Sequence, residues 1–254
     1  MKKTPYLYNT IQSEEIQEFI SDNFGKGGGY IAHELKSEYV HTDTMLIESK
    51  NADRTFVTFG MGARKMNTPN NAKRCELVMY STKNIATESK ESFIISGELA
   101  RISKFPFRED TWLGTGHTMD ASEEFKETFG YDFFAFKKLS LSAKLTGIDE
   151  DIDFLLLVPI YAEEREWCVN NHTLAFLDQL NEKYDGAEFN ADVQREMLLP
   201  EAIDEDEIDD YNYMTVLGID APTFNKLCEY IVTANDKGIE ITSEIIDSWK
   251  KGNR

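Results

Sequence analysis

The stretch "IDFLLLVPIY", residues 152–161, is the most informative part of this chain for its architecture. It is apolar apart from Asp153, whereas a strand with one solvated face alternates apolar and polar residues. A continuous apolar run of this length is typical of a strand that is covered on both faces. We therefore expect a central strand here, with Pro159 near its end, because proline has no N–H group to donate within a sheet.

Four further stretches are typical of strands. They are "TDTMLIES" (42–49), "RTFVTFG" (54–60), "RCELVMY" (74–80) and "FAFKKLSLSA" (134–143). The first two are joined by "KNAD", a polar connection of hairpin length. The second and third are joined by "GMGARKMNTPNNAK" (60–73), a long loop that contains glycine, asparagine and proline. Long loops of this kind often carry function.

Apolar residues at helical spacing predict three helices around these strands. The first has its apolar face between residues 16 and 24, and we expect Ser13 to cap its start. The second covers 91–104, with Pro106 just past its end, and the third covers 173–184. The order helix, strands, helix, strands, helix predicts an α+β fold, a mixed β-sheet flanked by helices.

The C-terminal part of the chain has a different composition. The segment "EAIDEDEIDD" (201–210) carries seven carboxylates in ten residues, and like charges at this density favour a solvated segment. Beyond it, apolar residues repeat at helical spacing in 224–232 and again in 241–249. We therefore expect a domain over 11–199, an acidic linker over 200–212 and a small helical hairpin extension over 213–254.

Composition excludes several classes of function. The chain has 254 residues and a formal net charge of -19, which opposes binding to nucleic acid and to anionic membranes. The same charge favours fast encounter with a basic protein partner. The three cysteines are too scattered for a disulfide framework or a zinc site. The first residues include two lysines but no apolar segment, so we expect no signal peptide and a cytoplasmic location.

One weak polar site stands out among the candidate chemical groups. His41 and Asp43 are two residues apart on an expected strand, so their side chains share a face, and His117 could approach them. A hydrolytic enzyme would use a histidine here as general base, and a metal-dependent enzyme would use all three as ligands. The alternative is that these side chains hydrogen-bond within a partly buried turn. No nucleophile elbow or metalloprotease motif is present, and we expect no catalytic residue, cofactor or metal.

Five stretches, taken in order, resemble the Suppressor of Fused domain. They are "VHTDTMLI" (40–47), "GMGARKMNTP" (60–69), "CELVMY" (75–80), "TWLGTGHTM" (111–119) and "IDFLLLVPIYAEE" (152–164). The resemblance spans about residues 11–199 and is closest to bacterial-type members. The candidate signature and binding-surface residues that it marks are Gly60, Gly62, Met66, Asn67, Pro69, Trp112, Gly114, Gly116 and His117.

This resemblance implies a function in protein binding. Animal members are cytoplasmic regulators that restrain Gli-type transcription factors, and many bacterial members resemble immunity proteins that neutralise polymorphic toxins. The family offers no catalytic residue to carry over. Because the long C-terminal half of the animal proteins has no obvious counterpart here, we expect an immunity or regulatory protein that occludes another protein such as a toxin. An acidic mimic of nucleic acid is a further hypothesis, and the oligomeric state stays open.

In the loop 111–119, the resemblance favours a signature loop over a phosphate-binding loop. We expect Gly114 and Gly116 to allow backbone conformations or close approaches that a Cβ would forbid. We expect Trp112 to pack into the core and His117 to fix the turn by hydrogen bonds. This loop could line one binding surface together with residues 60–67.

Overall fold

A computed structural model of the chain separates into two compact units, Met1–Ala202 and Ile203–Arg254. It describes residues 4–25, 30–34, 37–48, 54–68, 74–184, 189–217 and 221–237, and further residues 239, 241–242, 245–246 and 248–249. None of the helices within these ranges combines the length and the apolar character that crossing a bilayer requires.

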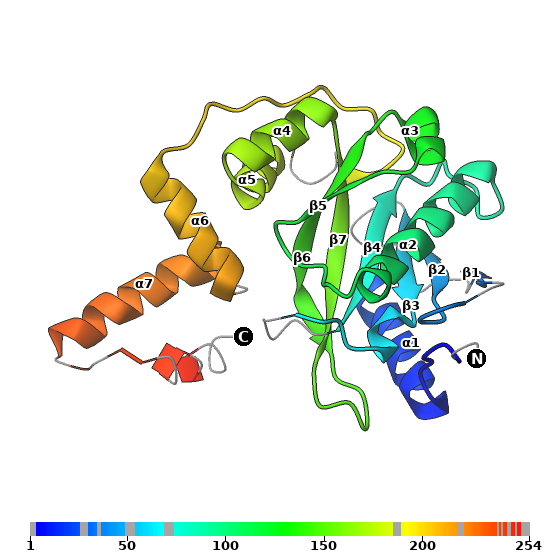
Figure 1. Cartoon of the computed structure of the whole chain (residues 1–254), viewed down its shortest axis with the longest axis horizontal. Helices are drawn as coiled ribbons and strands as arrows, with labels where there is room; N and C mark the ends of the chain where they lie inside the picture. Colours follow the sequence, from blue (N-terminus) through cyan, green and yellow to red (C-terminus); the bar gives the residue numbers. More distant parts are fainter. Residues whose placement is uncertain are drawn as a thin grey trace. The chain divides into compact units, whose positions relative to one another are not determined.

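The first unit is built on a seven-stranded sheet of order β1-β2-β3-β4-β7-β6-β5 (Figure 1). The strands are β1 (Tyr30–Ala32), β2 (Asp43–Glu48), β3 (Arg54–Phe59), β4 (Cys75–Ser81), β5 (Thr118–Asp120), β6 (Phe133–Ala143) and β7 (Ile152–Ile160). β4 and β7 pair in parallel and every other neighbouring pair is antiparallel. The predicted α+β fold with a mixed sheet is confirmed.

The central position of β7 is also confirmed. Every residue of β7 is buried, and the strand lies between β4 and β6. Pro159 is the residue before its last and lies opposite Phe134 of β6. The apolar run from Phe154 to the end of this strand therefore follows from its cover on both faces.

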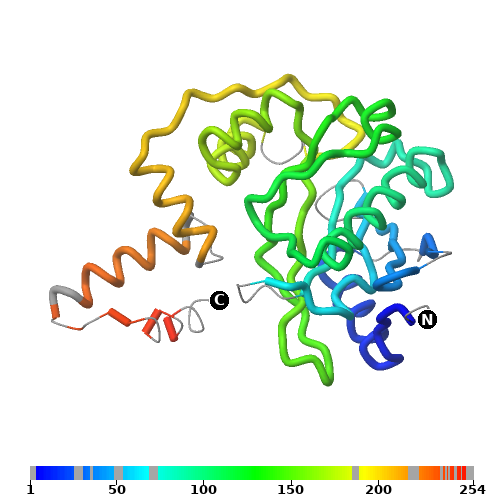
Figure 2. Tube along the Cα trace, in the orientation of Figure 1, coloured from blue at the N-terminus to red at the C-terminus, as the bar shows by residue number. Residues whose placement is uncertain are grey.

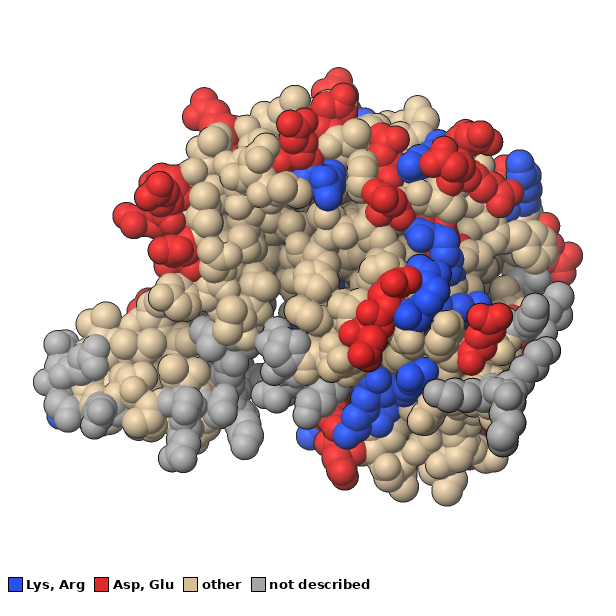
Figure 3. Space-filling model, in the orientation of Figure 1, with Lys and Arg blue, Asp and Glu red and all other residues tan. Residues whose placement is uncertain are grey.

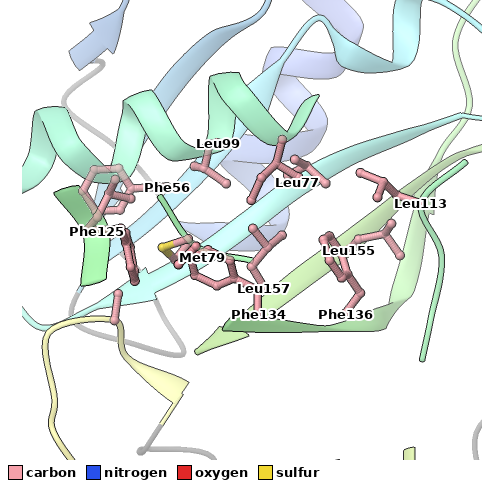
Figure 4. Close-up of a cluster of buried hydrophobic side chains, with 14 of the residues drawn as sticks. Phe56, Leu77, Met79, Leu99, Leu113, Phe125, Phe134, Phe136, Leu155 and Leu157 are labelled. Carbon is pink, nitrogen blue, oxygen red and sulfur yellow. The ribbon is translucent and has the colours of Figure 1, made fainter. Parts of the chain in front are cut away.

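The covering helices lie on opposite faces of the sheet. On one face, Leu155 and Leu157 of β7 belong to the core cluster beneath α2 (Lys90–Arg108) and α3 (Glu123–Phe129), as Figure 4 shows around Leu99. On the other face, Phe154 stacks on Phe19 of α1 (Thr10–Phe24) with ring centroids 5.4 Å apart. Alternate residues of one strand thus fill two cores.

Two details of the helices differ from expectation. Ser13 does not cap α1, because Asn9 accepts a hydrogen bond from the N–H of Gln12 while the Gln12 side chain accepts from the N–H of Asn9. This reciprocal pair starts the helix one turn earlier. Pro106 does not follow α2 but lies in its last turn. A proline there removes a single hydrogen bond close to a helix end, which is a smaller loss than in the middle.

Two further helices and a returning segment close one end of the sheet. β7 leads into α4 (Ala162–Asn170) and α5 (Thr173–Tyr184), and the third predicted helix is confirmed as α5. Residues 189–192 lie against the end of β4, where the N–H of Ala191 donates to the carbonyl of Tyr80, and residues 193–202 then run beside α4 and α5 (Figure 2). The indole N–H of Trp167 donates to the carbonyl of Pro200 over 2.9 Å, which holds this segment on α4.

The second unit contains α6 (Glu205–Leu217) and α7 (Ala221–Asp236). Most of the segment expected as an acidic linker is therefore helical. The side chain of Asp204 accepts from the N–H of Glu207 over 2.9 Å, and carboxylates in a first turn interact favourably with the positive end of the helix. α7 contains residues 224–232, the first of the two C-terminal stretches with apolar residues at helical spacing. The second stretch, 241–249, lies partly outside the described residues. The domain boundaries stay a prediction.

Candidate functional site

The carboxylate of Glu76, the second residue of β4, organises the loop that follows β3. Its side chain is completely buried although it lies between the apolar residues Cys75 and Leu77. The donors to it are Tyr8 Oη (2.8 Å), Thr58 Oγ1 (2.6 Å), Gly60 N (3.0 Å), Met61 N (3.2 Å) and Gly62 N (3.0 Å). Burial raises the pKa of Glu76, and these hydrogen bonds oppose the rise. One side chain thereby fixes three consecutive backbone N–H groups.

Two positions of this loop require glycine, because a Cβ atom there would clash with neighbouring atoms. Gly60 has φ of 124°, and a Cβ there would lie 2.1 Å from the carbonyl oxygen of His41. A Cβ on Gly62 would lie 2.4 Å from Tyr8 Oη and 2.9 Å from Ile152 Cγ2. All three distances are too short for a side chain, so the loop can reach Glu76 only with glycine at these positions.

The loop that follows α2 lies directly beside the first one. The N–H of Leu113 donates to Met66 Sδ over 3.4 Å, and Asn67 Nδ2 donates to the carbonyl of Asp110 over 3.4 Å. We call residues 60–68 and 110–117 together the paired-loop surface. The structure thus brings together the two loops that carry the candidate signature residues. Pro69, a further signature residue, lies outside the described residues.

The second loop is held by its backbone. Gly116 has φ of 83°, so its expected conformational role is confirmed, and its N–H donates to the carbonyl of Phe136. Gly114 is different, because a Cβ there would make only an ordinary contact, 3.5 Å from Trp112. The half-buried Trp112 packs against the core cluster, as expected.

The His117 side chain does not fix this turn by hydrogen bonds. Its ring packs on Trp112 with centroids 5.4 Å apart, and within the described residues no hydrogen bond of the ring accompanies this contact. The backbone of His117 instead exchanges hydrogen bonds with Gly114 and Phe136. Burial lowers the pKa of His117, which favours the neutral ring.

The weak polar site of the sequence is only partly assembled. His41 Nε2 lies 3.1 Å from Asp43 Oδ1, and His33 Nδ1, which sequence reasoning did not select, lies 2.9 Å from Asp43 Oδ2. His117 does not join them. It precedes β5, five strand positions from β2 across the sheet, and strands about 4.8 Å apart place it roughly 24 Å away.

The hydrogen bonds around His41 favour a structural role for this cluster. Ser37 Oγ lies 2.7 Å from His41 Nδ1, so serine, histidine and aspartate are connected in a chain. However, the Ser37 hydroxyl donates its proton to Glu34 Oε2 over 2.8 Å, so His41 Nδ1 is left to act as donor rather than as base. Glu34 also accepts from the N–H of Thr42 and pairs with Lys104 of α2. No group of three metal ligands forms within the described ranges.

Arg64 of the paired-loop surface is clamped between two aromatic rings. Its guanidinium carbon lies 5.2 Å from the ring centroid of Tyr6 and 5.0 Å from that of Phe107 at the end of α2. The backbone of Tyr6 is held by its own hydrogen bonds, from its N–H to Tyr39 and from the N–H of His41 to its carbonyl. Three segments far apart in sequence thus converge on one cation.

Other cations near this surface are neutralised by carboxylates. Lys65 and Arg74 both pair with Glu150, and Arg108 pairs with Glu109 at 2.6 Å. Arg64 has no carboxylate within 4 Å among the residues described here. Figure 3 shows acidic and basic side chains interspersed on the visible face. Sequence reasoning missed Arg64, Tyr6 and Glu76; a glutamate inside the strand "CELVMY" was the one available signal.

Comparisons with known proteins give the family and the fold. The family model described as Suppressor of fused protein (SUFU) matches residues 38–196, more than half of the chain. A crystal structure of a SUFU homologue from Neisseria gonorrhoeae has a TM-score of 0.56 and 14% identity, and the match covers 76% of this chain and all of that one.

Two further solved structures are less similar. A Sufu chain in a Sufu–Fu complex has a TM-score of 0.49 and 11% identity, with 76% of this chain and 93% of that chain covered. Drosophila Suppressor of Fused has a TM-score of 0.49 and 13% identity, with 75% of this chain and 51% of that chain covered. The comparison with curated proteins finds no match.

Proposed function

The chain belongs to the Suppressor of fused family, and we propose that it is a non-catalytic protein-binding domain that acts as an immunity or regulatory factor by occluding a partner protein. The observation that carries this proposal is that the backbone of the paired-loop surface is held in place, by Glu76 at residues 60–62 and by hydrogen bonds to Phe136 in the second loop. A surface whose backbone is fixed before binding loses little conformational entropy when a partner docks.

The side chains of this surface support binding to a protein. Trp112 and Arg64 are partly exposed there, and tryptophan and arginine are enriched among residues that dominate interface energetics. Trp112 packs against the core cluster that includes the buried Met66 and Leu113, and Arg64 lies over the ring of Phe107 of the same cluster. The partly exposed side chains thus stand on a well-packed base, which is the usual arrangement for an interface hot spot.

The charge of the chain supports a role in association. The formal net charge of -19 would attract a basic partner such as a nuclease toxin over a distance set by ionic strength. The first turn of α6 concentrates this charge in Glu205, Asp206 and Glu207. In this proposal the acidic residues accelerate the encounter with a basic partner, and the paired-loop surface makes the specific contact with it.

The hydrolytic or metal-dependent alternative has less support. It required His117 beside His41 and Asp43, and the order of the strands separates them. The remaining group of Ser37, His41 and Asp43 directs its hydroxyl proton to Glu34. The proposed function is therefore limited to binding.

The test is affinity purification of the tagged chain from its source organism, read by mass spectrometry. The wild type is compared with Trp112→Ala on the paired-loop surface and with Val169→Ser, a control at an exposed position on α4. We expect one stoichiometric protein with the wild type and the control, and its loss with Trp112→Ala, with the purification carried out well below the melting temperature of that variant, which falls because Trp112 packs against the core cluster. Equal recovery with all three would contradict the assignment of the surface.

A further inference from the structure

We propose that the guanidinium of Arg64 is a recognition site for a carboxylate side chain of the protein partner, an aspartate or glutamate in an exposed segment. This inference rests on the proposed function and adds to it the chemistry of one contact. It starts from the position of Arg64 between the rings of Tyr6 and Phe107.

The first argument is that Arg64 has no anionic partner among the described residues of a strongly acidic chain. The sequence has 46 carboxylate residues and 27 lysines and arginines, so carboxylates are in excess. The nearby Lys65, Arg74 and Arg108 each pair with one. Within the described residues, Arg64 has neither an ion pair nor a side-chain hydrogen bond. The N–H donors of its side chain are therefore not used by the part of the chain that the structure describes.

The second argument is that the cation is oriented in advance. Two aromatic rings within 5.2 Å restrict a planar guanidinium, whose N–H donors lie in its own plane. The backbone that carries Arg64 follows directly on the three N–H groups held by Glu76. A bidentate contact with a carboxylate consequently costs less side-chain entropy than it would at a mobile arginine.

The third argument concerns access and the kind of partner. Tyr6 is 56% exposed, so its ring is open to an incoming segment as well as to Arg64. The net charge of -19 disfavours a polyanion such as nucleic acid, whereas a single carboxylate faces much weaker repulsion. We therefore commit to one acidic side chain that is followed or preceded by an apolar residue packed on Tyr6.

The test uses a phage-displayed library of random twelve-residue peptides against the full chain, followed by titration of individual enriched peptides. The variants are Arg64→Gln and Arg64→Lys. The matched control is Arg108→Gln, because Arg108 also lies over a ring, that of Phe105, but pairs with Glu109. Melting temperatures are measured for every variant, and the lysine variant retains the charge if the glutamine variant is unstable.

We expect enriched peptides to share an Asp or Glu beside an apolar residue. Their affinity should fall at least about tenfold with Arg64→Gln and clearly with Arg64→Lys, and should be unchanged with Arg108→Gln. Arg64→Glu should bind peptides in which the shared acid is replaced by lysine. Enriched peptides that bind the Arg64 variants as well as the wild type would overturn this inference but leave the proposed function standing. A library without any enriched peptide would count against both.

Discussion

The hydroxyl of Tyr8 donates a hydrogen bond to the carboxylate of Glu76 over 2.8 Å, although the two residues are 68 positions apart in sequence. The same carboxylate accepts from the N–H groups of Gly60, Met61 and Gly62. The N-terminal segment and the loop after β3 are therefore held by one buried group. Since Tyr6 and Arg64 lie two residues beyond these contacts, this group also sets the geometry between them.

Replacement of Glu76 tests this organising role. In Glu76→Gln, the amide NH2 would face backbone N–H donors that need an acceptor, so at least one buried donor loses its partner. We expect the free energy of unfolding to fall by about 1–3 kcal/mol in denaturant titrations. The control is Glu38→Gln at an exposed glutamate, which should change it by less than about 0.5 kcal/mol. Equal stability of both variants would show that the loop does not depend on Glu76.

The glycines provide a second test, in which three Gly→Ala substitutions have different outcomes. Gly62→Ala should destabilise by about 1–3 kcal/mol, because the new Cβ would lie 2.4 Å from Tyr8 Oη. Gly114→Ala should be nearly neutral, since its Cβ makes an ordinary contact. Gly97→Ala, in the middle of α2 with nothing within 4 Å of its Cβ, should stabilise by up to about 1 kcal/mol. The same rank order is expected in thermal unfolding, and a stabilising Gly62→Ala would be incompatible with the structure.

Two half-buried histidines, His117 and His172, predict how stability depends on pH. Burial lowers the pKa of His117 and of His172 below the ordinary value of 6.5, so the unfolded chain binds their protons more tightly than the folded chain does. Protonation of these rings therefore favours the unfolded chain. Their contribution to the free energy of unfolding is complete above about pH 6.5, and it is lost as the pH falls through that value towards the folded pKa. His117→Gln should remove its share of this slope and leave that of His172. An unchanged slope would mean that His117 titrates as in the unfolded chain.

The charge of α6 provides a test of steering. We expect Glu205→Gln, Asp206→Asn, Asp209→Asn and Asp210→Asn combined to slow association with a basic partner, by about tenfold at low ionic strength. The difference should shrink as salt is added. Asp204 and Glu207 are left unchanged, because their reciprocal hydrogen bonds start the helix. The measurement is the stopped-flow association rate of the wild type and of this variant. Equal rates at low salt would show that α6 has no part in steering the partner.

Patterns of neighbouring residues were sufficient for much of the fold. The apolar run of β7 predicted its central position, and helical spacing predicted α1, α2 and α5. Short elements were missed: β1 and β5 have three residues each, and α3 has seven. Elements this short show too few repeats for a period to be recognised. Helix α6 was not predicted, because its carboxylates were interpreted as mutually repelling charges of a linker and not as favourable charges at a helix N-terminus.

The site was predictable only where its residues are close together in sequence. The resemblance marked both loops of the paired-loop surface, but contacts between distant segments could not be inferred. The two rings around Arg64 come from the N-terminal segment and from α2, whereas Arg64 itself lies in the loop after β3. Asp43 pairs with His33 as well as with His41. His117 was grouped with His41 because sequence does not fix the order of strands in a sheet.

The most direct measurement is hydrogen–deuterium exchange of the chain alone and in complex with the partner that affinity purification identifies. If the partner covers the paired-loop surface, amide exchange should slow in residues 60–68 and 110–117 on binding, with Val169 of α4 and its neighbours unchanged. Protection confined to other segments, with both loops exchanging as in the free chain, would contradict binding through this surface.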